Sequence, residues 1–256
     1  MVSEMSQETK KSPNIDTRGL YYREINDYLK QAAYNGYRKI KLKNVAGQRF
    51  ICANLNAQTE IDIFGKPGDD LGAFINGPFI NVHGNVRNGC GNNMSEGKII
   101  IHGHVGDNIG LSAHGGEILV MGNAGYRAGL FMKELASQKP VILIGGTACD
   151  FPGQYMAGGI LIVLGLNLSE GEIHPTHFIG SGMRNGVIYF KGSVKKDQID
   201  KQMDLVELDK EDNELLGKYI SEYSLCFGYK ADKILDRKFI KVVPHSLKHI
   251  SQVLHE

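Results

Sequence analysis

Pairs of apolar residues two positions apart recur along the middle of the chain, and each pair is followed two residues later by a glycine. This spacing places both apolar side chains on one face of a β-strand. The glycines that close the runs are Gly65, Gly84, Gly103, Gly122, Gly146, Gly165 and Gly192. They are separated by 19, 19, 19, 24, 19 and 27 residues, which predicts short strands with a 19-residue period and two insertions.

We call the equivalent positions in successive repeats a column. The column four residues before the closing glycine contains Ile61, Ile80, Ile99, Ile118, Ile142, Leu161 and Ile188. The column two residues before it contains Ile63, Val82, Ile101, Val120, Ile144, Val163 and Phe190. A third column, two residues after the glycine, contains Pro67, Val86, Val105, Ala124 and Ala148. All three columns are apolar or small, so we expect them to face a common core.

Glycine marks the corners of the repeat. A GxxGxxxG pattern follows the run in several repeats, with Arg87 and Cys149 replacing the middle glycine in two of them. Such glycines allow a positive φ or a close approach of two backbones, and at Gly106 and Gly125 we expect a positive φ. The predicted turn glycines are Gly65, Gly68, Gly72, Gly84, Gly91, Gly103, Gly106, Gly110, Gly122, Gly125, Gly129, Gly146, Gly153 and Gly165. The repeat is too short for a helical hairpin or a propeller blade, so it predicts a parallel β-helix of about seven rungs.

The flanks of the repeat are expected to cover its open ends. Residues 1–18 are expected to be a flexible tail, and residues 19–46 to form a cap. The cap would contain a helix over 19–35, with Tyr21, Ile25, Tyr28, Leu29 and Ala32 at helical spacing, and a strand over 38–45. Residues 47–193 would form the β-helix. Residues 194–256 would form an arm with a helix capped by Asp209, a short helical stretch over 231–236 and an extended segment over 239–243.

One outward-facing column is apolar over four successive rungs, with Ile100, Leu119, Leu143 and Ile162 side by side. Monomers seldom leave such a stripe exposed to water. We therefore expect it to be covered by the C-terminal arm or by another subunit, which makes it a candidate partner-contact stripe.

Composition narrows the class of protein. The 29 basic and 28 acidic side chains leave a net charge of +1, which argues against electrostatic binding of nucleic acid. The apolar runs are too short to span a bilayer, and the polar first 12 residues do not resemble a secretory signal. The four cysteines, Cys52, Cys90, Cys149 and Cys226, are widely spaced. We expect a cytoplasmic protein that binds neither membrane nor nucleic acid.

Few residues are candidates for chemistry. His83 and His102 share a column, with His104 close by, which raises a metal site as a minor alternative to a polar surface pair. Asp69, Asp107 and Asp150 would lie about 10 Å apart, too far for acid–base work on one bond, and are expected to bond turn backbones. We expect no catalytic, cofactor-binding or metal-binding residue in this chain.

Several segments resemble the GXGXG-repeat C-terminal domain of the glutamate synthase large subunit. They are residues 44–50 (NVAGQRF), 101–107 (IHGHVGD), 125–129 (GYRAG), 140–146 (PVILIGG), 150–159 (DFPGQYMAGG) and 239–244 (FIKVVP). The resemblance runs from about Tyr21 to the end of the chain. It implies that the β-helix is right-handed. It also implies a separate, non-catalytic subunit that holds glutaminase and FMN/iron–sulfur synthase subunits together, with FMN and the cluster in a partner.

Three alternatives remain open, two for the function and one for the assembly. The same β-helix occurs in the C subunit of formylmethanofuran dehydrogenase and in the related formyltransferase/hydrolase complex. The insertion over 131–139 and the 239–244 ending favour glutamate synthase over these complexes. A carbohydrate-active β-helix enzyme is the third hypothesis, and it would need converging carboxylates that the pattern does not show. Self-association of the isolated chain is a further alternative to assembly with partners.

Overall fold

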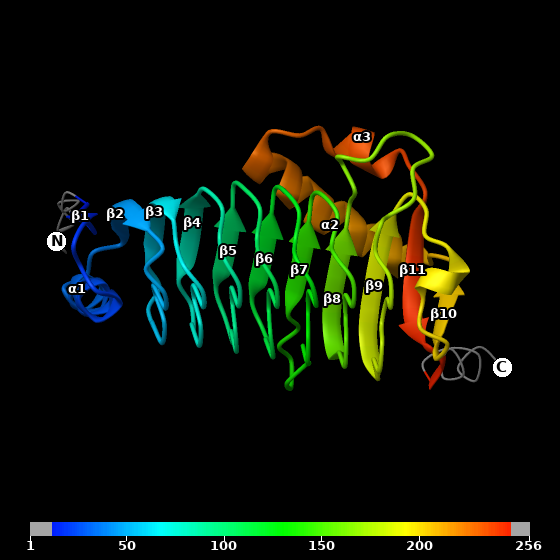
Figure 1. Cartoon of the computed structure of the whole chain (residues 1–256), viewed down its shortest axis with the longest axis horizontal. Coiled ribbons are helices and arrows are strands. Elements are labelled where there is room, and N and C mark those ends of the chain that lie inside the picture. The colour runs from blue at the N-terminus through cyan, green and yellow to red at the C-terminus, as the bar shows by residue number, and fades with distance from the viewer. Residues whose placement is uncertain (1–11, 247–256) are drawn as a thin grey trace, which may run out of the picture.

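The computed structural model describes residues 12–246 and shows a right-handed parallel β-helix, as the sequence predicts. Its parallel strands stack side by side in chain order along the coil (Figure 1). They are β2 (Lys39–Ala46), β3 (Glu60–Lys66), β4 (Phe79–His83), β5 (Lys98–Ile101), β6 (Glu117–Val120), β7 (Val141–Ile144), β8 (Ala157–Val163) and β9 (Asn185–Lys191). Strands β3 to β9 are the seven that the repeat predicts.

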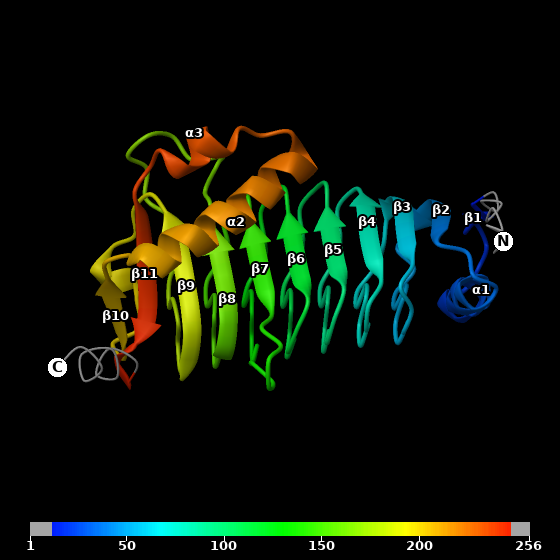
Figure 2. The same ribbon diagram turned by 180° about the vertical axis from the view of Figure 1, so that it is seen from behind.

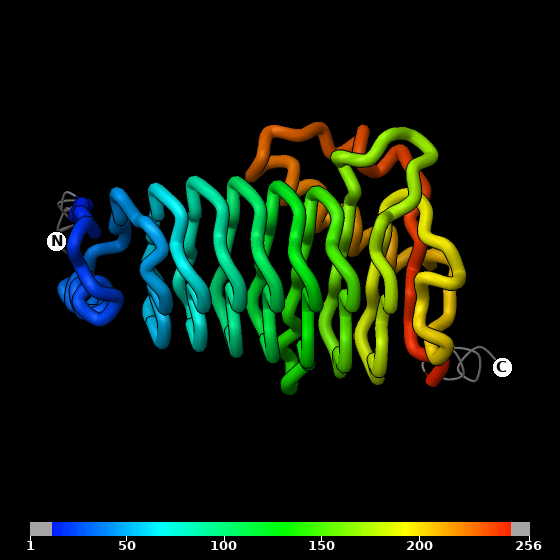
Figure 3. Tube along the Cα trace, in the orientation of Figure 1, coloured from blue at the N-terminus to red at the C-terminus, as the bar shows by residue number. Residues whose placement is uncertain are grey.

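The register of the sheet follows the sequence columns. Ile61 pairs with Ile80, Ile80 with Ile99 and Ile99 with Ile118, and the column continues to Ile188. Both apolar strand columns are buried in one continuous core. A second wall of the coil runs through the parallel bridges Val86–Val105, Val105–Ala124 and Ala124–Ala148, which confirms the third column. Figure 3 shows the chain winding through these walls at each turn.

The first turn is closed by strand β1 (Asn14–Asp16) and helix α1 (Tyr22–Tyr34). Ile25, Leu29 and Ala32 pack into the core, whereas Tyr21 and Tyr28 are at least half exposed. Strand β1 pairs in parallel with β2, so the expected flexible tail is wrong for residues 14–16. The ladder hydrogen bonds to β2 order this polar segment without burying a large apolar face. Residues 1–11 of that expected tail lie outside the described residues.

The other end is closed by the C-terminal arm. A short 3₁₀ turn (Lys196–Gln198) leads to β10 (Met203–Val206), α2 (Lys210–Phe227), α3 (Ala231–Leu235) and β11 (Phe239–Pro244). Strand β11 pairs antiparallel with β9 on one side and with β10 on the other. Helix α2 crosses the outer face of the sheet in Figure 2. The two helices and β11 agree with the predicted elements, whereas β10 was not predicted.

Candidate functional surfaces

The corner glycines meet two different steric demands. Gly110 and Gly129 are left-handed, at φ +67° and +75°. Gly106 and Gly125 are not, so the expected positive φ at these two positions is wrong. A Cβ on Gly106 would instead collide with the side-chain oxygen of Asn88, and one on Gly125 with that of Asp107. Crowding between neighbouring rungs, rather than φ, requires glycine there.

Those oxygens belong to a ladder that links successive rungs. Asp69 Oδ1 accepts from the Asn88 N–H at 3.2 Å, Asn88 Oδ1 from the Asp107 N–H at 2.8 Å, and Asp107 Oδ1 from the Tyr126 N–H at 2.9 Å. Asp150 Oδ1 accepts from the His177 N–H at 2.8 Å. The prediction that the three aspartates bond turn backbones is confirmed. The carboxylates stabilise the corners and do not converge on one point.

The apolar stripe is covered by the chain's own helix α2. Ile100, Leu119, Leu143 and Ile162 are at most 5% exposed and pack in a second cluster with Leu216, Ile220 and Tyr223 of α2. Tyr223 also donates its hydroxyl hydrogen to the Met121 carbonyl at 3.2 Å. Coverage by the C-terminal arm is therefore confirmed, and the alternative that these four residues contact a partner is wrong.

The three histidines that the sequence raised as a possible metal site do not all lie together. The rings of His83 and His102 stack with centroids 5.2 Å apart, and Phe64 stacks on His83. His83 Nε2 lies 3.3 Å from Asp62 Oδ1, and burial lowers the pKa of His102. His104 instead accepts the Asn123 N–H through Nδ1 at 2.9 Å, as part of another corner ladder. Within residues 12–246 no three His, Cys, Asp or Glu side chains gather as a metal site would require.

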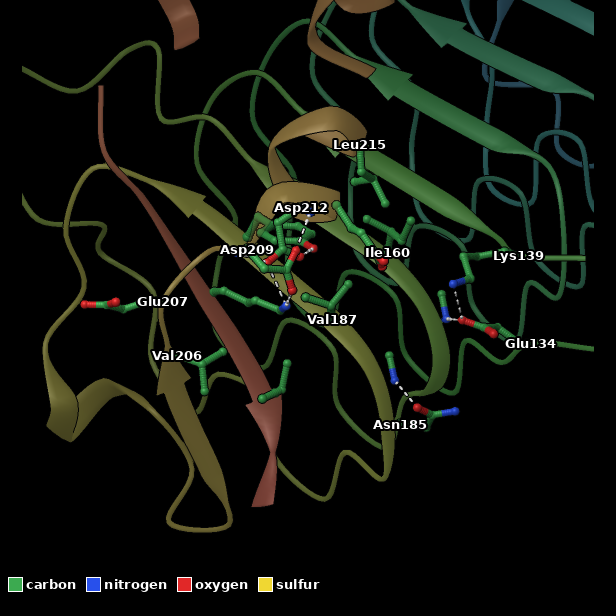
Figure 4. Close-up of a pocket in the computed structure, with 16 residues that line it drawn as sticks. Glu134, Lys139, Ile160, Asn185, Val187, Val206, Glu207, Asp209, Asp212 and Leu215 are labelled. Carbon is green, nitrogen blue, oxygen red and sulfur yellow. Dashed lines mark hydrogen bonds and ion pairs between the residues drawn. The ribbon is translucent and has the colours of Figure 1, made fainter. Parts of the chain in front are cut away.

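A cavity of about 470 Å³ lies where the N-terminus of α2 meets β9 and β11 (Figure 4). At its base, the Tyr189 hydroxyl donates to Asp212 Oδ1, and Lys241 Nζ donates to Asp212 Oδ2 at 2.7 Å. Asp212 and Asp209 also cap the helix, each accepting the backbone N–H of the other. Burial raises the pKa of Tyr189, so its hydroxyl remains protonated. Both oxygens of Asp212 are engaged, and the network anchors α2 to the sheet.

Two stacked pairs of aromatic residues lie at corners of the last rungs, and we call these four residues the aromatic face: Phe131, Phe151, Tyr155 and Phe178. Phe131 stacks on Tyr155 at 5.3 Å, and Phe151 stacks on Phe178 at 4.6 Å. Phe131, Tyr155 and Phe178 are about half exposed, at 49%, 50% and 55%.

All four residues of the aromatic face have left-handed backbones, with φ between 53° and 65°. The equivalent positions on earlier rungs include Asn93 and Asn108, which tolerate this conformation better than phenylalanine does. The column analysis missed this surface, because each residue is a single apolar position among glycines and hydropathy does not report φ.

The coil, its glycine corners and its covered stripe define a class of protein, the single-stranded parallel β-helix with a helical arm. Residues 34–245 match the family model described as GXGXG motif. The chain belongs to this GXGXG motif family, of the glutamate synthase C-terminal type.

One relative and one solved structure show how far this similarity extends. The chain is 45% identical over 240 residues to the uncharacterized protein MJ1350 of Methanocaldococcus jannaschii, covering 91% of this chain and 92% of that protein. A chain of the formyltransferase/hydrolase complex from Methylorubrum extorquens, solved with methylofuran, has a similar fold with a TM-score of 0.57. It is 15% identical, and the match covers 91% of this chain and 92% of that chain. No helix within residues 12–246 is long and apolar enough to cross a membrane.

Proposed function

We propose that this chain is a non-catalytic scaffold subunit of a cytoplasmic multi-subunit complex. The observation that carries the proposal is the near full-length match in fold to a chain of the formyltransferase/hydrolase complex. The aromatic face adds support, because large apolar side chains stand there on left-handed backbones and partly in water. Both features cost free energy, and binding of a partner would explain why they are kept. A stacked coil suits such a role because each rung is held by hydrogen bonds to both neighbours.

Two complexes are candidates, and a different observation favours each. The fold match favours a complex of the formyltransferase/hydrolase or formylmethanofuran dehydrogenase type. The sequence motifs, with residues 239–244 now placed in β11, favour glutamate synthase. In that complex the partners would be a glutaminase subunit and a synthase subunit that carries FMN and an iron–sulfur cluster. Comparison with solved structures supports the formyltransferase-type assignment at least as well.

Co-expression tests the proposal and distinguishes the two complexes. The chain is expressed with the glutaminase and FMN synthase polypeptides of its own source, and separately with the formyltransferase and hydrolase polypeptides. Size-exclusion chromatography with light scattering then measures the stoichiometry. A complex of defined stoichiometry with one set of polypeptides shows to which of the two complexes the chain belongs. The activity of that complex is then assayed with and without this chain. A chain that elutes apart from both sets, or that turns over either substrate alone, contradicts the scaffold function.

A further inference from the structure

A second cavity, of about 510 Å³, lies between the loop that follows β8 and the segment joining α2 to β11. Four cationic side chains line it: Lys191, Lys230, Lys233 and Arg237. No described carboxylate lines it. Among the described residues, an ion pair of this set joins Arg237 Nη2 to Glu170 Oε2 at 3.9 Å, and Glu170 is almost fully exposed. The cavity therefore presents a concentrated positive charge without an internal counterion.

Lys191 is the cation of this cavity that comes from the β-helix itself. It ends β9 in the outward column that Leu164 occupies one rung earlier, and it is only 8% exposed. Its ammonium makes no hydrogen bond or ion pair with any described residue. Burial and the neighbouring Arg237 lower the pKa of this lysine. The hydrocarbon stem of Lys191 is buried, whereas its Nζ atom is not among the buried side-chain atoms that lack a partner, so the ammonium faces the solvent of the cavity, where an anion could reach it.

The negative end of the α2 dipole does not explain why the charge of Lys191 lies in this cavity. Gly228, the left-handed C-cap of α2, lines the same cavity, and the carbonyl end of a helix attracts cations. That attraction explains Lys230, two residues beyond the cap. Lys191 comes from the sheet instead and donates to none of the α2 carbonyls.

We propose that this cavity binds a small organic anion whose carboxylate or phosphate group pairs with Lys191. Its volume lies within the range of small-molecule sites, about 300–1,000 Å³. Leu166 and Ile234 supply apolar wall for the body of the ligand, and Tyr229 adds an aromatic side chain. The arm contributes Lys230, Lys233 and Arg237 to the same cavity, and Lys191 comes from the last rungs. An anion bound between them would therefore hold the arm against the coil. The inference does not depend on the identity of the complex.

Calorimetric titration of the full chain tests the site. Inorganic phosphate and succinate serve as separate probes at constant ionic strength, and they distinguish a phosphate from a carboxylate preference. Lys191→Met, nearly equal in length, is expected to weaken binding of the preferred probe at least tenfold. Lys133→Met removes the same charge from an exposed site on another rung and is expected to leave binding unchanged.

Thermal melting provides an independent readout. Without added anion, Lys191→Met is expected to melt at a higher temperature than the parent chain, because a partly desolvated charge is removed from among three other cations. The preferred probe is expected to raise the melting temperature of the parent and of Lys133→Met, but not that of Lys191→Met. Binding of either probe that requires Lys191 supports the site. Absence of binding by both probes, or equal binding by folded Lys191→Met, overturns it.

Discussion

At the corners after β5 and β6, Gly106 and Gly125 lie against side-chain oxygens of the preceding rung. The same oxygens accept backbone N–H groups, so the ladder and the glycines depend on each other. A residue with a Cβ would have to displace the acceptor and leave a backbone donor unpaired. These glycines therefore stabilise the stacking of rungs, whereas left-handed glycines such as Gly110 set the direction of the chain.

Gly125→Ala is expected to lower the free energy of unfolding by about 1–3 kcal/mol, because the new methyl group collides with Asp107. Gly217, in the middle of α2, has open space where its Cβ would lie. Gly217→Ala is therefore expected to raise the free energy of unfolding by about 0.5–1 kcal/mol through helix propensity. Denaturant unfolding of both variants measures the contrast. Equal effects of the two substitutions would rule out the steric explanation.

A buried histidine makes stability depend on pH. His174 is fully buried, its Nε2 lies 2.9 Å from the Lys191 carbonyl, and burial lowers its pKa below the ordinary 6.5. As the pH falls through 6.5, the unfolded chain gains a proton that the folded chain does not take up. Stability therefore decreases on acidification and is unaffected by this group at higher pH.

His174→Gln keeps a side-chain N–H donor and removes the titration. Below pH 6.5, its free energy of unfolding is expected to fall less steeply, by up to ~1.4 kcal/mol per pH unit. His102, whose pKa is also lowered by burial, leaves part of the slope in the variant. Urea unfolding at pH 7.5, 6.5 and 5.5 measures the difference. Parallel pH profiles of the parent chain and the variant would contradict this origin.

At the scale of elements, helix α2 covers the apolar stripe that another subunit would otherwise have to cover. Its buried face, Leu216, Ile220 and Tyr223, covers side chains from β5 to β8. The Asp209–Asp212 cap, with Tyr189 and Lys241, fixes its first turn (Figure 4). Beyond its C-terminus, the cationic cavity separates the arm from the last rungs. The arm is therefore held by apolar packing along the length of α2 and by the charged network at the first turn of that helix.

Ile220→Ala is expected to destabilise the arm by about 2–5 kcal/mol, because it leaves a cavity against the stripe. Leu225 lies on the same helix and is 87% exposed, so Leu225→Ala is the matched control and is expected to change stability by less than about 0.5 kcal/mol. Hydrogen exchange of α2 amides would show whether the loss is local. Weakened protection confined to the coil, with α2 unaffected, would contradict the packing described.

The elements differ in how well the sequence predicts them. The isoleucine columns fix strand positions and register because each rung repeats the same spacing, as Ile99 and Ile118 do. The four-residue strand β10 has too short a pattern to stand out, and its partner β11 lies far along the chain. Lys191 could be placed in an outward column, but the residues opposite it depend on the path of the arm. The 19-residue period predicts contacts between rungs, but not contacts between a rung and a segment outside the repeat.

For the whole molecule, the coil has two unequal outer surfaces. The sheet face is covered by α2 over its C-terminal rungs, whereas Phe131, Tyr155 and Phe178 of the aromatic face remain about half exposed. Earlier rungs place Asn54, Asn93 and Ser112 in the column of Phe131 and Tyr155. The backbone therefore accepts small polar residues there, and the corner geometry does not require aromatic side chains.

The double variant Phe131→Asn, Tyr155→Asn tests whether the aromatic face binds the partners of the proposed complex. Asparagine relieves about 1 kcal/mol of left-handed strain at each site, while the lost ring stacking costs about 0.5–1.5 kcal/mol. The free energy of unfolding of the isolated variant is therefore expected to lie within about 1.5 kcal/mol of that of the parent chain. Its affinity for the partner found by co-expression is expected to fall at least tenfold, as measured by calorimetry.

Phe74→Asn is the matched control for that experiment. Phe74 occupies the same column on an N-terminal rung, has a left-handed φ of 59° and is 56% exposed, but lies outside the stacked pairs. Its substitution is expected to leave partner affinity unchanged. If both variants lose affinity equally, the partner contacts the whole length of this wall. If neither loses affinity while both stay folded, the aromatic rings serve only to stack successive rungs, and the partner binds another surface of the coil.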